Sequence, residues 1–403
     1  MTNNTSLAIH GGNPVRAEPM PARYAIGEAE KQMIQEVLAF YEERGLDPGY
    51  QGEFEARYCE AFSNYLGGGH ADAVATGTVA VYVAIAAASL PQGSEVLVSP
   101  ITDSGTLSAI LMNGLVPRPV DSGVNSFNVT SATVRDALTD NTSAAVLVHC
   151  AGQAISDIAE IASLLRDSGI KLIEDCSQSH GAEVSGAKVG TFGDISAFST
   201  MYRKAHITGA SGGVVFSRDE NLYRMALAHA DRGKPTWEPG FDFRDPRKFL
   251  FPALNLHTDE ISCGIGLASL ARLDEVRQAR LRYVAAVCDA LDEIAGVASY
   301  GYSGDDSPFF QPVMVESGAI KCDKTSFAEA VMAEGIAINP HYRYLIVDWP
   351  WLTPYFSTPV DTPNARHVID NSFNLYVNEK YDDAEAKDTI AAIKKVSEYF
   401  GIA

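Results

Sequence analysis

Short apolar runs alternate with helical patterns between residue 71 and about residue 217. Short apolar runs that are bounded by turn-forming residues predict buried strands. Strands that alternate with helices predict a largely parallel sheet with helices on both faces, which is an α/β fold. The predicted strands are Ala71–Ala75, Glu95–Ser99, Leu115–Val120, Ala144–Cys150, Lys171–Asp175, Ile195–Ser199 and Gly213–Ser217, and the predicted helices are Val79–Leu90, Gly105–Asn113 and Asp157–Asp167.

The pattern changes in the second half of the chain. Gly233–Phe251 is rich in proline, glycine and charged residues and predicts an excursion from the preceding domain. A helical pattern from Asp259 to about Ala295 is longer than most globular helices, and we expect it to lead the chain out of that domain. The remainder predicts a smaller α/β domain with strands at Phe309–Val315 and Ile336–Ile338 and helices at Ser326–Glu334 and Ala384–Tyr399. We therefore expect an N-terminal arm and a large domain over residues 1–270, and a small C-terminal domain over residues 271–403.

Composition and charge fit a soluble globular protein. The chain has 403 residues, of which 46% are hydrophobic and 20% charged, which is ordinary for such proteins and enough for two domains. The formal net charge of −20 argues against a nucleic-acid partner, because phosphate contacts require clustered Lys and Arg. The simplest interpretation of this charge is solubility.

Cysteine usage indicates a reducing compartment, and the apolar stretches indicate neither a signal peptide nor a membrane span. The six cysteines have no CxxC spacing, so we expect neither a disulfide framework nor a metal site. Met1–Gly12 lacks the basic and apolar regions of a signal peptide. The longest nearly apolar stretch, Val79–Leu90, is too short to cross a bilayer. We expect a cytoplasmic protein that is not inserted in a membrane.

Chemically useful residues stand at the ends of the predicted strands. Thr76–Gly77–Thr78, Asp175 and Ser199 each fall at or just past the carboxyl end of an apolar run. Ligands of open α/β sheets bind at that edge. Gly77 and Thr78 also precede a predicted helix, whose free N–H groups and dipole favour an anion. A glycine–threonine pair alone is weak evidence, and its weight comes from its place in the alternating pattern.

Lys204 follows one of these strands and precedes the glycine-rich segment Gly209–Gly213. A lysine held in a pocket loses part of its preference for the charged form and becomes a usable nucleophile. With Asp175 upstream, the set matches the needs of pyridoxal phosphate: a lysine for a Schiff base, a carboxylate for the pyridine nitrogen and a nest for the phosphate. The alternatives are a solvated lysine and an aspartate that caps the next helix.

Two further side chains follow Asp175 closely. Gln178 can donate a hydrogen bond to the ring oxygen of the cofactor, although a surface glutamine is the simpler interpretation. His180 fits in the site equally well as a structural histidine.

Several blocks of the sequence resemble the sugar aminotransferases of the DegT/StrS type, in order and with matching spacing. The resemblance extends from AIHGGNPVR near the N-terminus into the C-terminal domain and covers nearly the whole chain. The blocks are ATGTVAVYVAI at 75–85, VHCAGQ at 148–153, IKLIEDCSQSHGA at 170–182, GTFGDISAFS at 190–199 and GASGGVVFS at 209–217.

The resemblance implies a fold-type I enzyme whose large domain has a mostly parallel seven-stranded sheet between helices. It implies a Schiff base between Lys204 and pyridoxal phosphate, with Asp175 against the pyridinium nitrogen and Gln178 at the ring oxygen. It also implies a homodimer with composite active sites, to which the partner subunit contributes a phosphate ligand. The implied phosphate ligands are Gly77, Thr78, Ser199 and, from the partner subunit, Asn255.

The chain departs from the family pattern at three places. His257 stands where the family has an arginine two residues after the asparagine, and Asp103 stands where an aromatic residue usually stacks on the cofactor ring. Thr200–Met201–Tyr202–Arg203 replaces the usual run before the lysine, and His206 follows it. Arg203 and His206 can bind an anionic substrate, or Arg203 is only a solvated loop residue.

We interpret the chain as an aminotransferase that moves an amino group from an amino acid, expected to be L-glutamate, to a keto-sugar. The motifs around residues 100–106 and 199–213 suggest 8-oxo-3-deoxy-manno-octulosonate, as in the branch that makes 8-amino-3,8-dideoxy-manno-octulosonate for lipopolysaccharide biosynthesis. One alternative is a nucleotide-linked keto-deoxysugar. We expect a negatively charged acceptor, for which the cationic candidates are Arg203, His206, Lys234, Arg244, Arg247 and Lys248.

Two other functions are weaker. A pyridoxal-phosphate dehydratase of the same family would have histidine in place of Lys204. A non-catalytic cofactor-binding regulator would have lost Lys204 or Asp175, and both are present.

Overall fold

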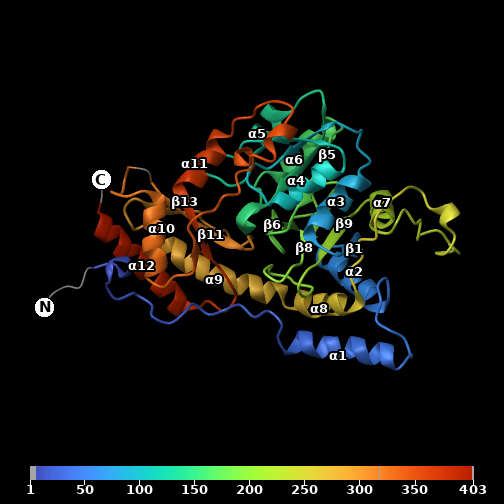
Figure 1. Ribbon diagram of the computed structural model, residues 1–403, viewed down its shortest axis with the longest axis horizontal. Helices are drawn as coiled ribbons and strands as arrows, with labels where there is room; N and C mark the ends of the chain where they lie inside the picture. Colours follow the sequence, from blue (N-terminus) through green and yellow to red (C-terminus); the bar gives the residue numbers. More distant parts are fainter. Residues whose placement is uncertain (1–5, 317, 402–403) are drawn as a thin grey trace.

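The computed structural model describes residues 6–316 and 318–401 and contains a large mixed sheet and a small antiparallel sheet (Figure 1). The large sheet has seven strands in the order β1-β9-β8-β5-β4-β2-β3, and β9 alone runs opposite to its neighbours. The predicted α/β fold with a mostly parallel seven-stranded sheet is confirmed. The strands are β1 (His70–Val74), β2 (Glu95–Val98), β3 (Val116–Pro119), β4 (Thr142–Val148), β5 (Lys171–Asp175), β8 (Ile195–Ser199) and β9 (Gly213–Ser217).

Helices cover both faces of the large sheet, as Figure 1 shows. Successive residues of β4 point into different cores: Ala144 and Val146 belong to one, and Ala145 and Leu147 to the other. This explains why the strands are nearly continuous apolar runs rather than alternating ones. One face carries α3 (Gly77–Ala87), α4 (Ser104–Met112) and α7 (Glu220–Ala230), and the other carries α2 (Glu53–Tyr65), α5 (Ser131–Ala137), α6 (Ile158–Asp167) and α8 (Glu260–Ala271).

The helical pattern from Asp259 to about Ala295 forms two helices rather than one, which corrects the sequence-based prediction. α8 ends at Ala271 and α9 (Leu273–Leu291) begins after Arg272, whose φ of −113° and ψ of 11° are not helical. The Arg272 guanidinium donates to Glu30 at 2.7 Å and also binds the carbonyl oxygen of Ala25. The break coincides with a contact to the N-terminal segment, and local helix propensity does not predict such a contact.

The small sheet has the order β10-β11-β13-β12, and all its pairs are antiparallel. Its strands are β10 (Val297–Ser299), β11 (Phe310–Val315), β12 (Ile338–Asn339) and β13 (Ser372–Tyr376). α9, α10 (Lys324–Ala333) and α12 (Asp383–Phe400) pack on it around a separate core, and α11 (Pro363–Asn371) precedes β13. The predicted smaller α/β domain is therefore present, while its exact boundary after residue 270 stays a prediction.

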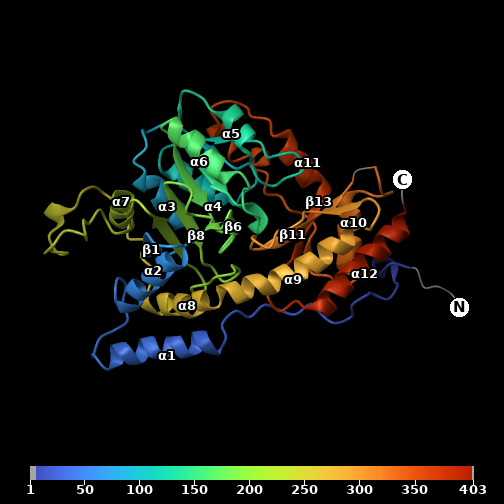
Figure 2. The ribbon, with the colours of Figure 1, turned by 180° about the vertical axis from the view of Figure 1, so that it is seen from behind.

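The N-terminal arm, residues 6–27, lies along the small domain before the chain reaches the large one. Leu7 is part of the small-domain core, and the N–H of Ala8 donates to Glu334 at 2.9 Å. The arm then leads to α1 (Glu28–Glu42), which packs on α8, as both Figure 1 and Figure 2 show. Within the described ranges, no helix has both the length and the apolar character needed to cross a membrane.

Candidate active site

Asp175 stands at the carboxyl end of β5, the middle strand of the large sheet. Its carboxylate is 4% exposed and accepts hydrogen bonds from the Thr106 hydroxyl at 3.0 Å and from the Ser177 N–H at 3.1 Å. No ion pair of the described residues includes Asp175. Because buried charges are usually paired, this carboxylate suits a ligand that presents a positive charge.

Lys204 lies in the turn that follows β8, where its N–H donates to the carbonyl oxygen of Met201 at 2.9 Å. The residue is 9% exposed, and its Nζ lies 4.3 Å from the centroid of the Phe309 ring. Burial lowers the pKa of Lys204 from 10.5 to about 8, although the charges of Asp175 and Asp103 act in the opposite direction. Roughly a tenth of the amine is therefore neutral and nucleophilic at pH 7, far more than for an ordinary lysine.

The first turn of α3 meets the end of β8. A Cβ added to Gly77 would lie 2.4 Å from the Cβ of Ser199 and 2.6 Å from its Oγ, so only glycine fits there. Thr76 caps the helix by accepting from the Val79 N–H at 3.0 Å. Thr78 lies beside Gly105 in the first turn of α4, since a Cβ on Gly105 would be 2.4 Å from the Thr78 hydroxyl. The N-terminal end of α3 thus meets the Ser199 hydroxyl, in a place where an anion is favoured, with Thr78 beside the first turn of α4.

Gln178 and His180 follow Asp175 on the same loop. The side-chain oxygen of Gln178 accepts from the Ala151 N–H at 2.7 Å, which leaves its NH₂ group to donate elsewhere. His180 is 2% exposed, and its Nε2 has no hydrogen-bond partner among the described residues. Burial, aided by His206 and Lys204, lowers the pKa of His180 well below 6.5, so the ring is neutral.

The structure does not bring Asn255 to Lys204 by any hydrogen bond between described residues. Asn255 is exposed and forms an isolated bridge with Asp231, beside a segment whose His257 pairs with Val74 at the end of β1. The role of Asn255 in a partner's site stays a prediction. The His257 ring stacks on Tyr50 at 4.5 Å, and its Nε2 lies 3.3 Å from Asp231.

Asp103 has a local role. It caps α4, because its carboxylate accepts from the Gly105 N–H at 2.9 Å. This capping explains why an aspartate is stable at that position without a contact to a cofactor ring.

Two expectations about the acceptor site are wrong. His206 is fully buried, with its ring nitrogens 2.6 Å from the Tyr58 hydroxyl and 3.2 Å from the Ser269 hydroxyl. Burial lowers the pKa of His206 to about 3, so it is neutral and packed in the interior. Lys234 is 7% exposed and its Nζ lies 3.1 Å from Asp231. Neither side chain is available to an anionic substrate.

The exposed cationic candidates differ in whether they are paired with a neighbouring acid. Arg247 binds Asp245 through two hydrogen bonds of 2.7 and 2.9 Å, which is a local charge pair. Arg203, Arg244 and Lys248 are exposed. Arg203 lies over the Tyr202 ring at 5.3 Å.

Sequence reasoning missed Thr106, Phe309 and Arg23. Thr106 lies in the predicted helix Gly105–Asn113, and sequence alone does not show that its hydroxyl reaches Asp175. Phe309 was placed only within a predicted strand. Arg23 donates to the carbonyl oxygen of Lys204 at 2.7 Å across 181 residues of chain, and no local pattern signals such a contact.

One buried cluster in the described residues has metal-ligating side chains, namely His149, Glu174 and Cys176. The His149 Nδ1 accepts from the Ile155 N–H at 3.0 Å, and its Nε2 lies 3.1 Å from Glu174. Glu174 also accepts from the N–H groups of Gly190, Phe192 and Gly193. The protein itself supplies partners for the ring nitrogens of His149 and the carboxylate of Glu174, which is the pattern of a structural cluster.

Comparison with known proteins gives consistent relatives. The profile of the DegT/DnrJ/EryC1/StrS aminotransferase family matches residues 26–394. The putative L-glutamine:3-amino-2,3-dideoxy-scyllo-inosose aminotransferase of Streptoalloteichus tenebrarius is 30% identical over 94% of this chain and 92% of its own length. The GDP-perosamine synthase of Vibrio cholerae is 31% identical over 58% of this chain and 62% of its own length.

Solved structures share the fold. An aminotransferase from Psychrobacter cryohalolentis superposes with a TM-score of 0.87 at 23% identity, covering 95% of this chain and 100% of that one. The E coli GDP-4-keto-6-deoxy-D-mannose-3-dehydratase with bound hydrated PLP gives a TM-score of 0.84 at 23% identity, covering 94% of this chain and 99% of that one. These similarities confirm the predicted fold.

Proposed function

Since the chain belongs to the DegT/DnrJ/EryC1/StrS aminotransferase family, we propose that it is a pyridoxal-phosphate enzyme that moves an amino group from an amino acid to a keto-sugar. The observation that carries this proposal is the buried Lys204 amine, whose pKa is lowered to about 8, in a site that also holds an unpaired buried carboxylate. A regulator that only binds the cofactor does not require a lysine in this state.

The residues present fit pyridoxal phosphate. Asp175 would hold the pyridine nitrogen, and Gln178 would use its free NH₂ group toward the ring oxygen. The cradle of Gly77, Thr78 and Ser199 would hold the phosphate. When bound, the cofactor supplies an aldehyde for the lysine amine and an electron-withdrawing ring.

The chain's own groups then have defined tasks. Lys204 first holds the cofactor through its amine and, once released, carries a proton. The neutral Nζ takes a proton from the carbon that bears the amino group of the donor, and it returns a proton to the acceptor carbon that receives the nitrogen. Burial of Lys204 keeps bulk water from competing for that proton.

The acceptor is a keto-sugar of undetermined identity. The named relatives act, according to their names, on a cyclic keto-polyol and on a GDP-linked sugar, which favours the nucleotide-linked alternative or a free ring ketone. Amination of 8-oxo-3-deoxy-manno-octulosonate, and a place in lipopolysaccharide biosynthesis, stay predictions without support from these relatives. The donor is L-glutamate or L-glutamine, because the inosose aminotransferase is named for glutamine.

We further propose a homodimer in which Asn255 binds the phosphate in the partner's site. The segment that precedes Asn255 exposes large apolar side chains: Phe243 is 52% exposed, Leu250 49% and Leu254 55%. A second subunit would cover such a surface.

The test combines trapping with a substrate screen. We expect the purified protein to be yellow and borohydride to attach the reduced cofactor to Lys204, as mapped by peptide mass spectrometry. Lys204→Ala should lack transamination. Glutamate and glutamine are each tested with a nucleotide-linked ketone, a free ring ketone and the octulosonate ketone. Attachment to another lysine, or a fully active alanine variant, would refute the proposal.

A further inference from the structure

The turn that carries Lys204 has little regular structure of its own. It lies between β8 and β9, outside every helix and strand of the described chain, and Tyr202 and Arg203 within it are exposed. A lysine on such a turn is held only as firmly as the groups that bind its main chain. The contacts of the turn with distant segments therefore decide how well the amine is placed.

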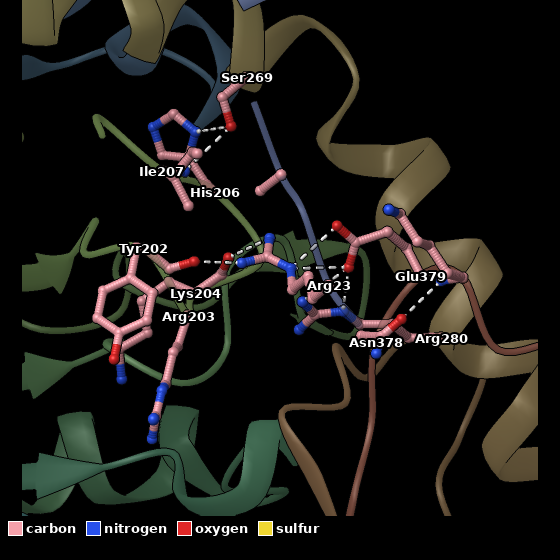
Figure 3. Close-up of polar contacts among 12 residues, drawn as sticks. Arg23, Tyr202, Arg203, Lys204, His206, Ile207, Ser269, Arg280, Asn378 and Glu379 are labelled. Atoms are coloured by element: carbon pink, nitrogen blue, oxygen red, sulfur yellow. Dashed lines mark hydrogen bonds and ion pairs between the residues drawn. The ribbon is translucent and has the colours of Figure 1, made fainter. Parts of the chain in front are cut away.

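Arg23 of the N-terminal arm makes this contact. One NH₂ group of its guanidinium donates to the carbonyl oxygen of Tyr202, and the other donates to that of Lys204 at 2.7 Å (Figure 3). The planar fork fixes the spacing of the two carbonyl oxygens, which a lysine side chain cannot do. The Nε of Arg23 donates to both oxygens of Glu379 at 3.0 Å, so Glu379 fixes the fork in turn.

Glu379 connects Arg23 to a second guanidinium, that of Arg280 on α9. Arg280 is 1% exposed and donates to Glu379 at 3.0 Å through one nitrogen and to the carbonyl oxygen of Pro308 at 3.2 Å through another. Pro308 precedes Phe309, whose ring lies 4.3 Å from the lysine Nζ. The shared carboxylate thus joins the support of the lysine main chain to the support of the ring beside its amine.

The charges of this network are firmly paired. Burial by itself raises the pKa of Glu379, but the charges of Arg280 and Arg23 outweigh burial and lower that pKa to about 2. Burial lowers the pKa of Arg280 to about 10, which still leaves it protonated. Glu379 and Arg280 therefore keep their charges across the pH range in which the enzyme is expected to work.

We propose that Arg23, Glu379 and Arg280 form a positioning network that aligns Lys204 with Phe309 and so places the amine for proton transfer. The network joins the arm, the small domain and the turn after β8 that carries Lys204, which we call the lysine turn. This inference rests on the proposed function of Lys204. Among the described residues, no hydrogen bond joins Arg23, Glu379 or Arg280 to the Nζ of Lys204, so the network acts on the lysine through its main chain and through the charge of Arg280, which also lowers the pKa of Lys204.

The chain offers a matched control in Arg16. It lies on the same arm, is 15% exposed against 14% for Arg23, and binds two acids of α12, Glu385 at 3.0 Å and Asp388 at 2.8 Å. The hydrogen bonds of Arg16 to described residues stay within the arm and the small domain. Arg16→Ala therefore removes the same kind of tie between arm and small domain without touching the lysine turn.

The first measurement is hydrogen exchange of the peptide around residues 200–208 in the full chain, without and with pyridoxal phosphate. We expect Arg23→Ala to speed exchange of the Lys204 amide at least about ten-fold, because the turn loses its outside support. Arg16→Ala should leave that exchange unchanged. Melting temperatures of the two variants show whether their general losses of stability are comparable.

The second measurement is the rate of amino transfer. A small misplacement of a reacting group can cost on the order of 100-fold. We expect Arg23→Ala to lower kcat by about 10- to 100-fold with little change in KM, and Arg16→Ala to keep kcat within about two-fold. Arg23→Lys, which can hold one carbonyl oxygen but not both, should recover part of the loss and also serves if Arg23→Ala does not fold.

Equal exchange and equal kcat for the two alanine variants would overturn the positioning role. Arg280→Met gives an independent check, because it should slow kcat and speed exchange most strongly around Phe309, with a smaller effect around Lys204 that is transmitted through Glu379. Borohydride mapping in the unaltered protein separates the two proposals. If the cofactor attaches to another lysine, the proposed function fails regardless of Arg23, whereas attachment to Lys204 with an unaffected Arg23→Ala variant rejects the network alone.

Discussion

A buried amine next to a buried carboxylate is the central feature at the scale of single residues. Burial favours the neutral form of Lys204, while Asp175 favours the charged form, and burial prevails because the pKa of the lysine falls to about 8. Since the unfolded value is about 10.5, the charged amine destabilises the fold below pH 8. This destabilisation disappears as the pH rises from about 8 to about 10.5. The site therefore gives up stability to make the lysine reactive.

This pKa can be measured directly. In protein freed of cofactor, acetylation of Lys204 with acetic anhydride should show a pH midpoint near 8, because only the neutral amine reacts. Lys31 provides an internal comparison, since its hydrogen bond to the exposed Glu28 raises its pKa above 10.5. Asp175→Asn should move the Lys204 midpoint lower still. A Lys204 midpoint at or above 10.5, read by peptide mass spectrometry across a pH series, contradicts the prediction.

The sequence predicted the place of single site residues that stand at strand ends. It did not predict the place of residues that are positioned by contacts with distant parts of the chain. Asp175 and Ser199 end buried strands, and the structure places them at that edge of the sheet. His206 was expected to face a substrate, but the rings of Tyr58 and Phe62 enclose it, and sequence does not show such burial. Arg23 gave no signal because its partners lie far along the chain.

At the scale of elements, the contact between α3 and β8 determines the shape of the proposed phosphate site. Gly77→Ala would place a methyl group 2.4 Å from the Cβ of Ser199, so the helix end and the strand end must separate. We expect the cofactor affinity to fall by at least about ten-fold, because positioned N–H groups are lost from an anion site. Gly301→Ala, with no atom within 4 Å of the new Cβ, is the control and should bind normally in a fluorescence titration.

The packing of α2 against β1 places two acids in the interior. Glu55 is 5% exposed, and burial raises its pKa to about 7, with added repulsion from Glu260 and Asp231. Burial also raises the pKa of Asp72 well above its usual value, and one of its carboxylate oxygens has no hydrogen-bond partner among the described residues. The folded protein therefore binds protons more tightly than the unfolded chain at both positions. For Glu55, the stability that this supplies is lost as the pH rises from about 4.5 to about 7.

Replacing Glu55 tests this dependence. Glu55→Gln removes the titration but can still accept the Gln51 N–H, which donates to Glu55 at 2.6 Å. We expect the melting temperature of Glu55→Gln, relative to that of the unaltered protein, to increase as the pH is raised from 5 to 8. The difference between the two pKa values of Glu55, 4.5 in the unfolded chain and about 7 in the folded protein, corresponds to a change in the free energy of unfolding of at most about 3 kcal/mol. Glu60→Gln, at an exposed position of the same helix, should follow the unaltered protein, and identical curves for the Glu55 variant would reject the prediction.

Elements were predictable to the extent that their burial is uniform. β5, β8 and β9 have the predicted bounds because they are apolar runs covered on both faces. α3 begins two residues earlier than predicted, since Thr76 caps it. The break between α8 and α9 was missed because it depends on the contact of Arg272 with the N-terminal segment, which helical periodicity does not contain.

At the scale of the whole molecule, α9 leads from the large domain to the small one, and the arm runs along the small domain to α1 (Figures 1 and 2). In addition, the segment around Ile346 and Leu352 packs into the core of the large domain. The lysine turn lies where the arm passes from the small domain to the large one. Arg23 therefore contacts both domains at once, through Lys204 in the large domain and Glu379 in the small one. On the far side, the segment that follows α7 projects from the body of the large domain (Figure 1). Its exposed Phe243, Leu250 and Leu254 are the strongest argument in the structure for a second subunit.

The composite site that this second subunit would create can be tested by complementation. In a heterodimer of Lys204→Ala and Asn255→Ala, one site would carry both lesions and the other neither, provided that Asn255 acts in the partner's site. Activity should then rise above that of either parent after subunit exchange. The upper limit is the activity expected when one of the two sites of each heterodimer is intact. Exchange is verified by mass spectrometry of differently tagged subunits. If both parents are impaired and exchange is complete, no recovery means that Asn255 acts within its own subunit, because every heterodimer site would then carry one lesion.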